Sequence, residues 1–114
     1  MRAISLCQAQ AIPEGAARGF DPDDDGQDAL FVVRSDGVLR AWRNACPHAG
    51  AAMALRKDVY LNAAGTRIVC HAHGAEFLPE NGLCVQGPCV GRRLTAVQIE
   101  INEKGELRAR LGNS

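Results

Sequence analysis

Alternating apolar and polar positions predict a chain of short β-strands separated by tight turns. Glycine, proline and aspartate recur between the apolar runs at intervals of about ten residues, which is typical of all-β domains. The runs span residues 3–7, 29–34, 38–43, 66–70, 94–101 and 106–111. We therefore predict an all-β fold built from antiparallel strands.

Two pairs of runs are predicted to form hairpins. Asp36 and Gly37 separate residues 29–34 from residues 38–43, and an Asp-Gly pair between apolar runs is a strong hairpin signal. Residues 94–101 and 106–111 each alternate apolar with polar positions. That alternation predicts a second hairpin with one buried face.

Residues 44–90 have a different character. This stretch is rich in loop-forming residues and holds all three histidines and four of the five cysteines. Its alanine-rich segment, residues 51–55, is compatible with a short helical turn. We expect this region to carry the chemistry of the protein.

Size and charge exclude several functional classes. The 114 residues predict a single domain over 1–114, and 46% hydrophobic with 23% charged residues is ordinary for a folded protein. Thirteen basic and thirteen acidic side chains give no net charge, which argues against a nucleic-acid or anionic-membrane partner. No apolar run is long enough to span a bilayer, and the N-terminal residues lack a signal-peptide pattern. We expect a soluble, cytoplasmic protein.

The cysteines and histidines form two spaced motifs. Cys46 and His48 make a C-x-H, and Cys70 and His73 make a C-x-x-H. Thiolates and imidazoles suit zinc or an iron–sulfur cluster. Structural zinc sites usually use other spacings. The two motifs fit two loops that each present one cysteine to one iron and one histidine to the other, as in a Rieske [2Fe–2S] centre.

On these motifs the chain resembles the Rieske family over almost its whole length. The matching segments are residues 46–50, 70–77, 81–82 and 87–88, the last within a proline loop that covers the cluster in the family. The resemblance implies an antiparallel Rieske-like β domain. A loop-rich cluster-binding subdomain, at about residues 44–90, would be inserted into it.

The resemblance also implies the ligands. Cys46 and Cys70 would bind the buried iron of one [2Fe–2S] cluster, and His48 and His73 the outer iron. The family's frequent proline stands here as His71, which we expect to be a bystander.

The implied function is electron transfer and not catalysis. The chain resembles the small Rieske-type ferredoxins, which would carry one electron from a flavin-dependent reductase to a terminal oxidoreductase such as a ring-hydroxylating oxygenase. It has no residues left for a second metal and no nucleotide-binding motif. Two alternatives stay open at this point: a Rieske-like small subunit of nitrite reductase, and a redox-inert structural zinc or interaction module.

The stretch between His48 and Cys70 is longer than is common in the family. We expect the surplus to form a surface excursion at residues 55–65. Cys84 and Cys89 flank the expected proline loop, either as two buried thiols or as a disulfide, which would need Cα atoms within about 7 Å. Cys7 is expected to be a small core or edge residue.

Residues 21–26 imitate the start of a calcium loop. The pattern is D-x-D-x-D-G, but the twelfth position is Val32 where a calcium loop needs glutamate. We expect an acidic loop in solvent, with partner docking as the second reading.

The residues around the motifs predict a low reduction potential. High-potential Rieske proteins have two cysteines that tie the ligand loops and a serine and a tyrosine that donate hydrogen bonds to the cluster. The corresponding positions here are Ala51, Ala72, Ala75 and Phe77. Without these donors we expect a reduction potential of about −150 mV.

Overall fold

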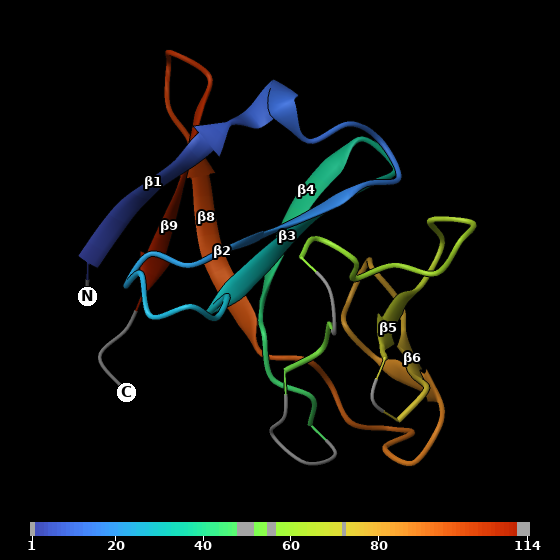
Figure 1. Cartoon of the computed structure of the whole chain (residues 1–114). Helices are drawn as coiled ribbons and strands as arrows, with labels where there is room; N and C mark the ends of the chain where they lie inside the picture. The colour runs from blue at the N-terminus through green and yellow to red at the C-terminus, as the bar shows by residue number, and fades with distance from the viewer. Residues whose placement is uncertain (1, 48–51, 55–56, 72, 112–114) are drawn as a thin grey trace.

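The chain folds into two antiparallel sheets (Figure 1). The structure is a computed structural model that describes residues 2–47, 52–54, 57–71 and 73–111. Among these residues, one sheet contains six strands and the other contains three. In chain order the elements are β1 (Arg2–Gln8), the 3₁₀ turn η1 (Ala9–Ala11), β2 (Ala17–Phe20), β3 (Leu30–Ser35), β4 (Val38–Arg43), β5 (Ile68–Cys70), β6 (Ala75–Phe77), β7 (Cys84–Gln86), β8 (Ala96–Ile101) and β9 (Glu106–Leu111). The predicted all-β antiparallel fold is confirmed.

The larger sheet has the strand order β1-β9-β8-β4-β3-β2. Strand β8 joins its two halves, because Ala96 and Val97 pair with β4 whereas residues 98–101 pair with β9. The smaller sheet, β5-β6-β7, is formed entirely by residues from the expected cluster-binding region. In Figure 1, β1, β8 and β9 lie on one side of the β2–β4 strands, and β5 and β6 lie on the other.

Strand β3 contributes to a hydrophobic core on each of its faces. Leu30 and Val32 belong to the core that includes residues of β9, whereas Phe31 and Val33 belong to the core that includes the cysteines of the smaller sheet. All four side chains are buried. The run of consecutive apolar residues in this strand therefore reflects burial on both sides.

Both predicted hairpins are present. Strands β3 and β4 pair from Leu30 opposite Arg43 to Ser35 opposite Val38, and β8 pairs with β9. Strand β9 buries its alternate residues, but Ile101 at the end of β8 is 54% exposed. The alternation therefore identified the strands correctly but overestimated burial at their tip.

Other expectations were wrong or incomplete. Strands β2, β6 and β7 were not predicted. Of the helical turn expected at residues 51–55, the described residues 52–54 are not helical, and the others lie outside the described residues. Within the described part of the chain, no helix is long and apolar enough to cross a membrane.

Candidate metal centre

The first candidate ligand, Cys46, follows the end of β4 and is fully buried. The base of its loop is fixed by Asn44, whose backbone N–H donates to the carbonyl of Ala29 at 3.0 Å. The Asn44 side chain accepts a hydrogen bond from the backbone N–H of Met53 at 2.7 Å and donates to the carbonyl of Asp28 at 2.9 Å. Because Met53 lies seven positions after Cys46, these bonds close the neck of the loop.

The second ligand motif is a tight turn at the end of β5. Cys70 is the last residue of this strand and is fully buried. Its carbonyl accepts hydrogen bonds from the N–H groups of His73 and Gly74, at 3.3 and 2.7 Å. Gly74 has a φ of +73°, a conformation that glycine adopts without steric cost. The turn brings the exposed His73 back over Cys70, with 4.0 Å between Nδ1 and Sγ.

Met53 connects the two ligand loops. Its carbonyl accepts a hydrogen bond from the N–H of His71 at 2.9 Å, while its own N–H is held by Asn44. The Met53 side chain is fully buried. The backbone next to Cys70 is therefore tied to the neck of the loop that carries Cys46.

Three of the four predicted ligands converge. One ligand atom from each of Cys46, Cys70 and His73 lies within 4.8 Å of the others. His48, the fourth, lies outside the described residues. Two buried sulfurs beside one exposed imidazole suit a centre with thiolate ligands on the inside and imidazole ligands at the surface. His71 is not part of this group.

Comparison with protein families decides between the chemistries that this donor set allows. The family model described as the Rieske [2Fe-2S] domain matches residues 2–105. This chain belongs to the Rieske family. Its cofactor is accordingly a [2Fe–2S] cluster, and the alternative of a structural zinc module is set aside.

Solved Rieske structures show the same fold. The chain is similar to the ferredoxin of carbazole 1,9a-dioxygenase from Nocardioides aromaticivorans IC177, with 23% identity, a TM-score of 0.68, and coverage of 96% of this chain and 97% of that chain. It is also similar to a chain in a complex of reduced oxygenase and oxidized ferredoxin in carbazole 1,9a-dioxygenase, with 24% identity, a TM-score of 0.69, and coverage of 94% and 91%. A search of curated protein sequences finds no match.

Two buried thiols flank the proline loop of this Rieske domain. The Sγ atoms of Cys84 and Cys89 are 3.3 Å apart and form no disulfide, and Cys84 Sγ donates to the carbonyl of Gln86 at 3.3 Å. Burial, and then the neighbouring sulfurs of Cys84 and Cys46, raise the pKa of Cys89 to about 12. At neutral pH the buried Cys89 is therefore a protonated, unreactive thiol.

Two of the positions where high-potential Rieske proteins carry hydroxyl donors, Ala75 and Phe77, are tightly packed. Ala75 and Phe77 in β6 are both fully buried. A Cβ on Gly87 would lie 2.7 Å from the Cα of Ala75, so the proline loop rests directly on β6. Ala51 and Ala72, which stand where high-potential Rieske proteins have the two cysteines, lie outside the described residues.

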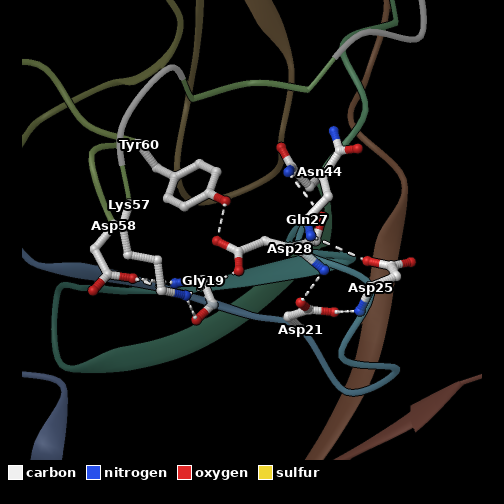
Figure 2. A network of polar contacts seen from close by, with 10 residues as sticks. Gly19, Asp21, Asp25, Gln27, Asp28, Asn44, Lys57, Asp58 and Tyr60 are labelled. Carbon is white, nitrogen blue, oxygen red and sulfur yellow. Dashed lines mark hydrogen bonds and ion pairs between the residues drawn. The ribbon is translucent and has the colours of Figure 1, made fainter.

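The expected surface excursion at residues 55–65 is wrong for Tyr60. This side chain is only 1% exposed, and its ring stacks on Phe31 with 4.2 Å between the ring centroids. Its hydroxyl donates to a carboxylate oxygen of Asp28 at 2.8 Å, as Figure 2 shows. Burial, and then this hydrogen bond, raise the pKa of Tyr60. The extra length of this Rieske chain is therefore partly core.

The acidic loop is exposed at residues 23–27, as expected, but Asp28 just after it is not. The Asp28 side chain is only 10% exposed and pairs with Lys57 Nζ at 2.9 Å, and Lys57 also donates to the carbonyl of Gly19 (Figure 2). A Cβ on Gly19 would overlap the Asp28 carboxylate, so the close approach of β2 to this side chain requires glycine at position 19. Asp21, at the start of the loop, instead accepts two backbone N–H bonds from the loop itself.

Sequence reasoning therefore missed the residues that support the ligand loops. Asn44, Met53 and Asp28 belong to no motif, since Met53 and Asp28 act through their backbone groups and the Asn44 side chain bonds only to backbone groups. The one available signal was Gly19, a glycine inside a strand, which often marks a close backbone approach.

Proposed function

We propose that the cluster of this Rieske protein is held by Cys46 and Cys70 on its inner iron and by His48 and His73 on its outer iron. The observation that carries the proposal is the convergence of Cys46, Cys70 and His73 within 4.8 Å. We assign His48 as the fourth ligand because its spacing from Cys46 matches the motif of the family. A [2Fe–2S] cluster with two histidine ligands transfers one electron at a time.

We further propose that the protein is a ferredoxin that takes its electron from a flavin-dependent reductase and delivers it to a ring-hydroxylating oxygenase. Exposure of His73 supports transfer through the histidine edge, whereas the cysteines are buried. The fold it shares with a carbazole 1,9a-dioxygenase ferredoxin supports the class of partner. We place this exchange in the cytoplasm, where reducing conditions keep Cys84 and Cys89 as thiols.

Rapid mixing of the reduced protein with candidate acceptors tests this proposal. Reoxidation of the cluster should accelerate with the concentration of a Rieske oxygenase and should be slow with a nitrite reductase. A His73→Ala sample, which should lack the cluster, gives the background of the assay. Fast reoxidation by nitrite reductase, with slow reoxidation by the oxygenase, would instead support a role as the small subunit of a nitrite reductase.

A further inference from the structure

Arg92 reaches from the segment after the proline loop to the first ligand loop. Its Nη1 donates a hydrogen bond to the carbonyl of Pro47 at 3.0 Å. Pro47 lies between Cys46 and His48 in the sequence, so the bonded carbonyl belongs to the peptide that leads into the histidine. The contact spans a sequence separation of 45 residues.

The backbone of Arg92 is fixed at both of its polar groups. Its N–H donates to the carbonyl of Cys89 at 2.9 Å, and its carbonyl accepts the N–H of Cys84 at 2.8 Å. The guanidinium therefore extends from a rigid base beside β7. This contact ties the first ligand loop to the proline-loop segment, just as Met53 ties it to the second ligand loop.

We propose that Arg92 is a positioning residue for the metal centre, holding the first ligand loop through Pro47 and favouring the reduced cluster through its positive charge. The proposal rests on the proposed function, since it takes Cys46 and His48 as ligands. Hydrogen bonds from a charged donor are stronger than neutral ones, and a planar guanidinium fixes their direction. A cation near the cluster stabilises the reduced state, which is the more negative of the two.

Three variants separate the hydrogen bond from the charge. Arg92→Met removes both, and Arg92→Lys keeps the charge without the planar fork. Arg93→Met removes the same charge from the adjacent residue, which is also exposed and whose side chain makes no hydrogen bond to the described residues. Each holoprotein is assayed for its midpoint potential by voltammetry and for its rate of iron loss to a chelator.

Arg92→Met should lower the midpoint potential and release iron about three- to tenfold faster than wild type. Arg92→Lys should keep a potential near that of wild type while releasing iron at an intermediate rate. Arg93→Met should release iron at the wild-type rate, even if its potential falls. Failure of Arg92→Met to assemble a cluster that Arg93→Met assembles also supports the proposal.

Equal rates of iron release from Arg92→Met and Arg93→Met would overturn the inference. An Arg92→Met potential no lower than that of wild type would overturn the electrostatic part. Neither result touches the proposed function. That proposal fails separately, if the wild-type protein itself contains no iron and sulfide.

Discussion

The strand sandwich and the cluster-binding half of this molecule are held together by different means. We use strand sandwich for the larger sheet, β1–β4, β8 and β9, whose two halves pack around one shared hydrophobic core. We use cluster-binding half for residues 44–47, 52–54, 57–71 and 73–92. In the sandwich, strands of up to seven residues bury aliphatic side chains such as Leu107 against one another. In the cluster-binding half, each strand has three residues, and the ligand loops depend on backbone hydrogen bonds to Asn44 and Met53.

This difference indicates which half depends on the metal centre for its stability. Burial of apolar area stabilises the sandwich without any cofactor. The ligand loops instead converge on two buried sulfurs, and the binding free energy of a metal centre is available only when its ligands are brought together. We therefore expect the two halves to respond separately to cluster loss and to core mutation.

The largest effect should come from removing a ligand. His73→Ala should abolish the visible spectrum of the cluster, because the exposed imidazole is part of the convergent group. The matched control is His71→Ala, two residues away and outside that group, which should keep the colour. Absorbance and iron content of the purified variants provide the measurement. A coloured His73→Ala protein with full iron content would show that His73 is not a ligand.

The next largest effect concerns the sandwich. Leu107 is fully buried, so Leu107→Ala should lower the free energy of unfolding by about 2–5 kcal/mol. The folded variant should keep the wild-type cluster spectrum. Ile101→Ala, at an exposed position, should change stability by only about 0.5 kcal/mol. Denaturant titration gives both values, and a changed cluster spectrum in folded Leu107→Ala would break the separation of the halves.

The sequence showed the sandwich well and the cluster-binding half unevenly. Residues 30–35 and 38–43 were identifiable because a turn signal separates two apolar runs. Strand β2 was missed because Arg18 and Gly19 interrupt its pattern. Strands β6 and β7 have three residues each, which is too short to show any periodicity.

The candidate site divides in the same way. The four proposed ligands were found through their spacing and the resemblance to the Rieske family. The burial of Tyr60 was not predicted, because its polar neighbours in the sequence suggest a surface loop. The ring is buried by stacking on Phe31, which is far away in the sequence. The bridging role of Met53 could not be read either, since its bonds come from the backbone.

The hydroxyl donors missing from β6 should affect the potential. We expect a wild-type midpoint potential of about −150 mV. Phe77→Tyr and Ala75→Ser should each raise it by roughly 50–100 mV, because a hydrogen bond to cluster sulfur stabilises the reduced state by about 1.5–3 kcal/mol at most. Phe77→Leu adds no hydroxyl and serves as the control. Voltammetry gives the values, and a wild-type midpoint well above 0 mV would refute the low-potential assignment.

Cluster removal should loosen one half selectively. In the apoprotein, the N–H groups of Met53 and His71 should exchange with solvent about tenfold faster or more, because their bonds join the ligand loops. The N–H groups of β8 and β9 should keep their protection. Hydrogen exchange on holoprotein and apoprotein measures both, and equal exchange at Met53 and His71 in the two forms would argue against coupling.

The smallest effect is a pH dependence confined to the sandwich. The Ser5 hydroxyl donates to Glu106 at 2.6 Å, which holds the pKa of this carboxyl below its ordinary value of 4.5. Because the folded state has the lower pKa, the stabilisation is present above pH 4.5 and is lost as the pH falls through the folded-state value. Ser5→Ala should raise the pKa in an NMR titration and leave the cluster spectrum unchanged. An unchanged pKa in Ser5→Ala would show that the hydroxyl does not set it.

The central claim is that two cysteines and two histidines hold one [2Fe–2S] cluster, and pulsed electron paramagnetic resonance on the reduced protein tests it most directly. The sample is isolated without oxygen and labelled with ¹⁵N in its histidines only, and its iron and acid-labile sulfide are assayed. The account predicts about two irons and two sulfides per chain and coupling of the electron spin to two histidine nitrogens. A colourless protein with a single zinc ion, or an iron–sulfur cluster with no histidine coupling, would contradict it.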